Sequence, residues 1–204
     1  MPKIYLLCFM KNPKLRPWLE AGIKRFANAG LDGINVNEIS AELKISKTSF
    51  YHFFGSKEEY IRELFEHWLQ EGTINLVRQA FLKDNPADII RELFKKVIFE
   101  NYLFEKFLSQ VINSQNSIPF SSKFLNESTK FRQATLDGLL TRLGLTPAEA
   151  RKRGINLQMH VLGWTQYHFN KEPSSSKKEE YFQSIFEMFF PEILNSDKDT
   201  NLKK

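Results

Sequence analysis

Hydrophobic residues recur at intervals of three and four along most of the chain, with polar residues between them. This spacing is typical of helices that bury one face, whereas no segment predicts a strand and no internal repeat is visible. Pro and Gly clusters mark the expected helix ends. The pattern predicts an all-α protein of about nine helices, near residues 17–29, 36–43, 47–54, 57–82, 86–101, 103–113, 121–143, 147–169 and 177–194.

The segment 45–60, ISKTSFYHFFGSKEEY, specifies a short helix with two faces. Ser46 can cap its start by accepting a hydrogen bond from a backbone N–H two or three residues later. Phe50, Phe53 and Phe54 fall on one side, while polar side chains occupy the remaining surface. One face is therefore predicted to pack and the other to present hydrogen-bond donors.

The flanking residues bound this helix and place another before it. Gly55 tolerates the left-handed turn that ends a helix, and Ser56 can cap the next one. Upstream, Asn35 with Glu38 marks the start of a helix that ends near residues 44–45. Two short helices joined this way predict a helix-turn-helix, whose second helix enters the DNA major groove. The alternative is an ordinary helical hairpin with a solvated polar face.

Five features at fixed spacing fall between residues 15 and 60: WLEAGIKRFANAG, Val36 with Ile39, Ile45-Ser46-Lys47, Tyr51 with Phe54, and Lys57-Glu58-Glu59. This segment, about a quarter of the chain, resembles the DNA-binding domain of the TetR family of bacterial transcriptional regulators. The remainder resembles the family in length and helical pattern. The resemblance implies a three-helix DNA-binding head and a helical body that binds an effector and forms a dimer.

Two residues depart from the family pattern. Lys44 stands in the turn where the family usually has Gly, so it must take a left-handed conformation at a cost of roughly 1 kcal/mol. Thr48 also replaces a common Gly and changes what reaches the groove.

The positive charge is confined to the predicted head. Residues 1–57 hold nine Lys or Arg and four Asp or Glu, whereas residues 58–204 hold twenty of each, so the whole net charge of +5 lies in the first part. Such a bias favours contact with phosphates. The candidates are Lys11, Lys14, Arg16, Lys24, Arg25, Lys47 and Lys57, each of which alone is equally an ordinary surface residue.

We divide the expected DNA contacts by role. Lys47, Thr48, Ser49 and His52 are expected to reach base edges. Tyr51, Lys57 and the helix start at Asn35 are expected to hold phosphates. The domains are placed at 1–13 for an N-terminal arm, 14–58 for the DNA-binding domain with its motif at 35–54, 59–195 for the effector and dimer domain, and 196–204 for a disordered tail.

The body offers three further expectations. The helix at 57–82 links head to body, and Gly72 within it favours a bend or break. The last two helices are apolar on more than one face, so we expect a four-helix homodimer interface; a thick single-chain core is the alternative. The interface residues are Leu157, Val161, Phe182, Phe186, Phe189, Phe190 and Ile193, while Ile155, Met159 and Leu162 lie on another flank.

Aromatic and polar residues of the body can line a cavity for a small apolar effector, although most such residues are ordinary core. The candidates are Phe99, Tyr102, Phe107, Phe131, Met159, His160 and Trp164, with His160 or Gln158 as a polar anchor.

The resemblance implies that effector binding shifts the linking helix, so that the two heads no longer fit a palindromic double-stranded operator and the DNA is released. Most members of the family are repressors, although activators exist. The other readings are a helical protein-binding adaptor with a vestigial head and a helical enzyme. No catalytic or metal site and no cofactor is predicted, and the spacing of Glu63 and His67 is a weak metal signal. One cysteine, Cys8, and no membrane-length apolar segment are consistent with a cytoplasmic protein without membrane contact.

Overall fold

The computed structural model describes residues 13–194, and within this range it contains ten α-helices and no strand. The predicted arm and tail fall outside the described residues, except for residue 13. The helices are α2 (Arg16–Ala29), α3 (Val36–Leu43), α4 (Lys47–Phe54), α5 (Lys57–Leu69), α6 (Leu76–Ala80), α7 (Pro86–Lys95), α8 (Tyr102–Asn113), α9 (Ser121–Arg142), α10 (Pro147–Tyr167) and α11 (Ser175–Phe189). A 3-10 turn, η1 (Gly30–Gly33), and two π-helical segments, η2 (Gln70–Asn75) and η3 (Lys96–Glu100), complete the fold.

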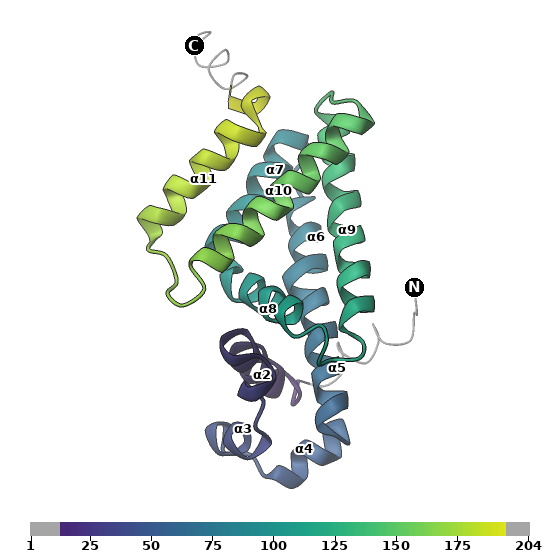
Figure 1. The fold of residues 1–204 in the computed structure, drawn as a ribbon, viewed down its shortest axis with the longest axis vertical. Helices are drawn as coiled ribbons and strands as arrows, with labels where there is room; N and C mark the ends of the chain where they lie inside the picture. The colour runs from purple at the N-terminus through teal and green to yellow at the C-terminus, as the bar shows by residue number, and fades with distance from the viewer. Residues whose placement is uncertain (1–12, 195–204) are drawn as a thin grey trace.

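Figure 1 shows two parts arranged along the long axis. The helices α2, α3 and α4 form a small head at one end, and α5 rises from the head into the body. In the body, α6, α7, α9 and α10 run roughly along the long axis, α11 lies at one side, and α8 lies across the base against α2. No helix among residues 13–194 is both long and apolar enough to cross a membrane.

Side-chain caps start the helices where the sequence places them. Each capping oxygen accepts a backbone N–H from the first turn of its helix, which satisfies a donor that has no partner inside the helix. The caps are Asn35 for α3, Ser46 for α4, Ser56 for α5, Asn85 for α7, Thr146 for α10 and Ser174 for α11. The predicted helix starts in the head are thus confirmed residue by residue.

The hydrophobic core of the head continues into the body. Phe26 of α2 lies with its ring centre 4.6 Å from that of Phe107 on α8, and both rings contact Phe65 of α5. These residues belong to one buried cluster that also includes Trp18 and Phe124. The expected division at residue 58 therefore falls within a continuous hydrophobic core.

A second cluster fills the upper body. Phe190, which directly follows α11, lies with its ring centre 5.5 Å from that of Phe94 on α7. Five of the residues expected at a dimer interface are buried here within the single chain, namely Leu157, Val161, Phe186, Phe190 and Ile193, and Phe182 and Phe189 are half-buried. The five buried residues contribute to the core of the single chain, in which α11 packs against η3 and α10, and the dimer interface stays a prediction.

The break expected near Gly72 is a π-helical segment. The backbone passes from α5 through η2 into α6 without leaving the helical path. A Cβ atom at Gly72 would lie 2.6 Å from Cδ1 of Phe104 on α8. Glycine is therefore needed here for the close approach of α8, in addition to its weak helix propensity.

Candidate nucleic-acid interface

Helix α4 divides into a buried and an exposed side as its sequence predicts. Phe50 and Phe54 are buried against Trp18 and Tyr60, with ring centres 4.8 to 6.3 Å apart. The phenol of Tyr60 donates to the carbonyl oxygen of Trp18 at 2.5 Å, and burial raises the pKa of Tyr60. These contacts fix α4 against both α2 and α5.

The residues expected to contact DNA lie on the opposite side or at the helix ends. Ser49 differs from the others because its backbone N–H donates to Ser46 Oγ and its own Oγ lies 2.9 Å from the same atom. Its hydroxyl is therefore partly committed to the start of the helix. Six of the seven expected residues are exposed, namely Asn35, Lys47, Thr48, Tyr51, His52 and Lys57, and Ser49 is half-buried.

The turn between α3 and α4 is built around Lys44. This residue has φ 56° and ψ 34°, the left-handed conformation predicted from the sequence. The N–H of Ile45 donates to the carbonyl oxygen of Ser40 at 3.0 Å, and that of Lys44 donates to Ala41, which closes the end of α3. The turn keeps its geometry without the glycine that suits it best.

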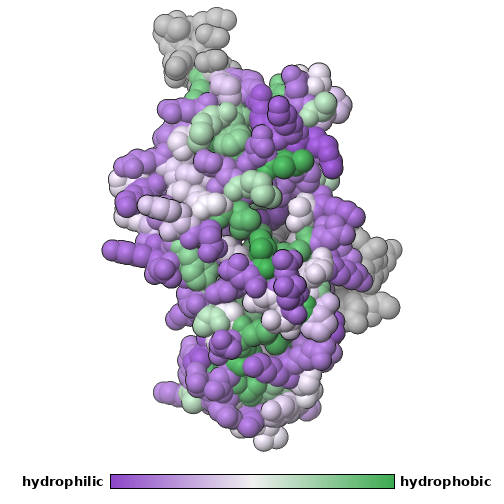
Figure 2. Space-filling view, viewed as in Figure 1, coloured by the Kyte–Doolittle hydropathy of each residue, from purple (hydrophilic) through white to green (hydrophobic). Residues whose placement is uncertain are grey.

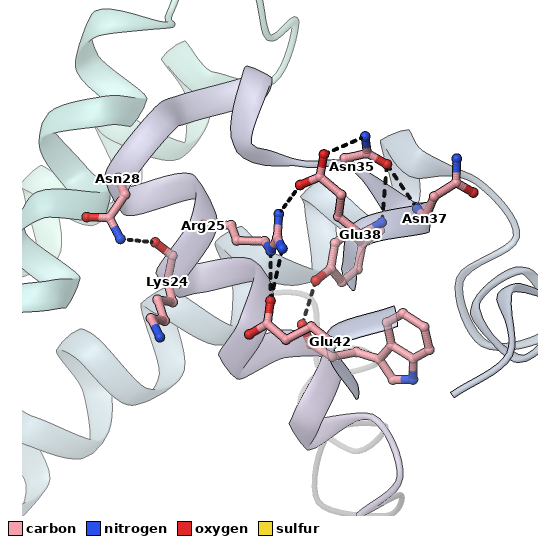
Figure 3. Close-up of polar contacts among 9 residues, drawn as sticks. Lys24, Arg25, Asn28, Asn35, Asn37, Glu38 and Glu42 are labelled. Carbon is pink, nitrogen blue, oxygen red and sulfur yellow. Dashed lines mark hydrogen bonds and ion pairs between the residues drawn. The ribbon is translucent and has the colours of Figure 1, made fainter. Parts of the chain in front are cut away.

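Arg25 joins α2 to α3 inside the head (Figure 3). Its guanidinium donates to Glu38 at 2.6 Å and to Glu42 at 3.0 Å, and the hydrogen bond with Glu38 raises the pKa of Arg25. Arg25 was a candidate for phosphate contact, but the structure directs it toward these carboxylates. Its role here is to hold α3 against α2.

Asn35 is also engaged by its own helix (Figure 3). Its Oδ1 accepts from the N–H groups of Asn37 and Glu38, and its Nδ2 donates to Glu38 Oε1 at 3.1 Å. With the side chain occupied, the backbone at the start of α3 is the part that remains to face a phosphate.

Other basic residues of the head point outward. Lys24, Lys44, Lys47 and Lys57 are exposed, and the ammonium of Lys47 lies 6.0 Å from the centre of the Tyr51 ring. Arg16 is exposed and pairs with Glu20 at 2.7 Å within α2. The candidate Lys11 lies outside the described residues.

The body contains a cavity of about 130 Å³. Of the seven residues expected to bind an effector, Met159 lines this cavity, and Gln158, expected as a polar anchor, lines it too. Phe107 belongs instead to the core shared by the head and the base of the body. Tyr102 donates to the carbonyl oxygen of His168, and His160 stacks on Tyr181. Phe99, Phe131 and Trp164 are likewise absent from the lining.

Sequence reasoning missed six polar lining residues: Thr73, Glu105, Ser128, Thr129, Arg132 and Thr135. A signal was present, because Glu105 falls on the inward face of the helix at 102–113, between the buried Tyr102 and Ser109. A buried carboxylate requires a cation, and Arg132 on α9 supplies it.

The weak metal signal at Glu63 and His67 finds no further support. Burial lowers the pKa of His67 and raises the pKa of Glu63. Across residues 13–194, no group of three or more His, Cys, Asp or Glu side chains is placed to hold a metal ion.

Similarity to known proteins identifies the type of head. The family model of bacterial regulatory proteins of the tetR family matches residues 19–64, which span α2 to α5 from Leu19. Residues 19–64 thus form a DNA-binding head of the TetR-family type. Within this head, α3, the turn at Lys44 and α4 make up the helix-turn-helix.

A curated relative matches a longer segment than the head. Over 130 residues this chain is 28% identical to YuxN, an uncharacterized HTH-type transcriptional regulator of Bacillus subtilis strain 168. The match covers 62% of this chain and 44% of YuxN, so the chain spans less than half the length of that relative.

Solved structures share the fold across head and body. A TetR transcriptional regulator from Legionella pneumophila superposes with a TM-score of 0.74 at 15% identity, covering 87% of this chain and 97% of that one. The TetR-family regulator PfmR from Thermus thermophilus gives a TM-score of 0.63 at 18% identity, with 85% and 96% covered.

Proposed function

We propose that this protein is a homodimeric, cytoplasmic repressor of the TetR family that binds a palindromic operator and leaves it when a small, largely apolar effector enters the body. Residues 14–58 bind DNA in this proposal, and residues 59–195 bind the effector and the second subunit. The observation that carries it is the exposed start of α4, where Lys47 and Thr48 stand free of the core that fixes the helix.

The roles on DNA follow from position. Residues at the N-terminal end of a recognition helix approach base edges, so Lys47, Thr48, Ser49 and His52 set sequence preference. Lysine favours guanine acceptors, and the methyl group of threonine packs on the thymine methyl. Tyr51, Lys57 and the backbone at Asn35 hold phosphates and orient the head.

The dimer interface is better supported on the second flank of α10. Ile155 and Met159 are 42% and 58% exposed, and Met188 on α11 is 54% exposed, although all three are apolar. Gly163 on α10 has open space where a Cβ would stand, which permits a close approach of another helix. A two-fold related pair would place two heads on a palindrome.

Selection of bound duplexes from a random DNA pool tests the proposal. We expect a two-fold symmetric site with half-sites about one helical turn, or a multiple of it, apart. As a matched pair, Lys47→Ala is expected to abolish recovery of that site, whereas Lys83→Ala, a change to an exposed lysine of the body, should leave it intact. A symmetric site recovered equally well with Lys47→Ala would contradict the role given to α4.

A further inference from the structure

The cavity lies between the linking helix and the base of the body. It is lined by η2 and α6 on one side, α7 and α8 on another, and α9 and α10 above. Figure 2 shows hydrophobic side chains around a hollow in the middle of the body, where α10 passes over α6 in Figure 1. Thr129 and Met159 are exposed lining residues, so the cavity opens beside them.

The apolar walls are almost entirely aliphatic. The chain contains 19 Phe, yet Phe94 is the one aromatic residue that the described chain places in the lining, and the other apolar residues are Leu, Val, Ile and Met. Aromatic walls offer flat faces on which a planar ring stacks. Branched aliphatic side chains instead make an irregular surface that a flexible saturated chain fills more completely.

The charged part of the lining is a buried ion pair, and its uncharged polar residues are Thr73, Ser128, Thr129, Thr135 and Gln158. Arg132 donates to both carboxylate oxygens of Glu105, at 2.5 Å and 3.2 Å, and its Nε donates to Thr73 Oγ1 at 3.4 Å. The side chain of Glu105 is 4% exposed, and that of Arg132 is 20% exposed. Within the described chain these bonds use three of the five N–H groups of Arg132, which leaves two donors for a ligand.

The charges of this pair cancel. A ligand carboxylate placed at Arg132 would add a second anion beside Glu105 in a region with little water, and one of the two would lack a counter-ion. A neutral oxygen that accepts a hydrogen bond meets no such cost. The pair therefore favours an uncharged polar end.

We propose that the cavity takes a neutral molecule with one saturated hydrocarbon chain and a hydrogen-bond-accepting end, such as an alkyl ester, with the end bound by Arg132. This inference rests on the proposed function, since it names the chemical class of the effector.

Calorimetric titration of the full chain with three matched probes tests both parts of the proposal. Methyl decanoate is expected to bind, decanoate keeps the chain but replaces the neutral ester with a carboxylate, and methyl 2-naphthoate keeps the ester but replaces the chain with a planar ring. We expect each change to weaken binding by roughly tenfold or more, the cost of one unpaired polar group or a poorly filled pocket. Tighter binding of either decanoate or methyl 2-naphthoate would overturn the proposal.

Two variants, with a third as control, test where the ligand binds. Glu105→Gln removes the carboxylate that balances Arg132, so decanoate should now bind more tightly than methyl decanoate. Glu100→Gln, a change to an exposed carboxylate of η3, should leave the original order unchanged. Val97→Phe narrows the cavity from η3 and should weaken the binding of methyl decanoate without changing the operator site. If Glu105→Gln has native circular dichroism and still binds methyl decanoate more tightly than decanoate, the role of Arg132 is refuted.

A parallel DNA-release assay separates this inference from the proposed function. If methyl decanoate binds with the expected selectivity but leaves the operator complex intact, the ligand class stands and the effector role fails. If a palindromic operator is found and none of the three probes binds, the operator role stands and the ligand class is overturned.

Discussion

Lys44 occupies the turn between α3 and α4 in a left-handed conformation that glycine would adopt with less strain. Its left-handed backbone closes α3 with two hydrogen bonds, but a side chain with a Cβ is strained in this conformation. The position was predictable because the turn occurs at fixed spacing between two capped helices.

We expect Lys44→Gly to stabilise the head by roughly 0.5–1 kcal/mol, because the relief of strain exceeds the added freedom of the unfolded chain. Denaturant unfolding measures the change. Lys152→Gly in the middle of α10 is the matched control, and it should destabilise by about 1 kcal/mol because that residue is helical. Destabilisation by both changes would show that the turn is not strained.

Lys57 and Lys47 are both exposed lysines, but they stand at the starts of different helices. We expect Lys57→Ala to weaken binding to all DNA sequences alike and to reduce the slope of log affinity against log salt by about one. Lys47→Ala should instead reduce discrimination between operator and altered sites. Fluorescence anisotropy over a salt series measures both, and a sequence-selective loss in Lys57→Ala would contradict a phosphate role.

At the level of elements, the π-helical segment η2 joins the DNA-binding side to the cavity. Thr73 of η2 accepts a hydrogen bond from Arg132, whose guanidinium also lies 5.1 Å from the Trp68 ring on α5. A ligand oxygen bound to the remaining N–H groups of Arg132 would therefore contact the same guanidinium that touches both segments. This arrangement offers a physical link between cavity and linking helix.

Gly72 is the residue on which this geometry depends. Gly72→Ala is expected to destabilise the protein by roughly 1–3 kcal/mol, because the new methyl group would collide with the Phe104 ring. Gly138→Ala in α9 is the control, since nothing lies within 4 Å of the point where its methyl group would stand, and it should stabilise by up to about 1 kcal/mol. Thermal unfolding of the pair tests the expectation, and equal effects would argue against a close approach of α8.

The sequence predicted elements better than it predicted their partners. Caps at Asn35, Ser46 and Ser56 are local patterns of a few residues, so the helix starts could be located from the sequence. Which apolar face meets another helix depends on contacts distant in sequence. Phe107 and Phe190 were therefore assigned to a cavity and an interface, although they pack in the two cores.

At the scale of the whole molecule, the head is attached to the body by two packed contacts. One is α5, and the other is α8, which places Phe107 against Phe26 and carries Glu105 in the cavity wall. Lys106 of α8 also donates to Asn28 of α2 at 2.7 Å. Ligand binding in the cavity can therefore alter the position of the head through the packing of either α5 or α8.

The proposed dimer interface can be tested by introducing charged side chains at the exposed apolar residues of α10 and α11. Ile155→Glu combined with Met188→Glu is expected to convert a dimer to a monomer, because two charges would be buried without partners at the interface. Sedimentation equilibrium measures the mass. Leu82→Glu, at a residue 80% exposed near the end of α6, is the control and should leave the mass unchanged. A dimer that persists in the double variant would place the interface elsewhere.

The central claim is that two heads with α4 at their tips bind a two-fold symmetric DNA site. The most direct measurement is selection from a random duplex pool by the full chain at moderate salt, followed by sequencing of the recovered sites. The account predicts a palindrome whose recovery depends on Lys47 and Thr48. Weak, salt-sensitive binding without a shared sequence, from protein shown to be dimeric, would contradict it.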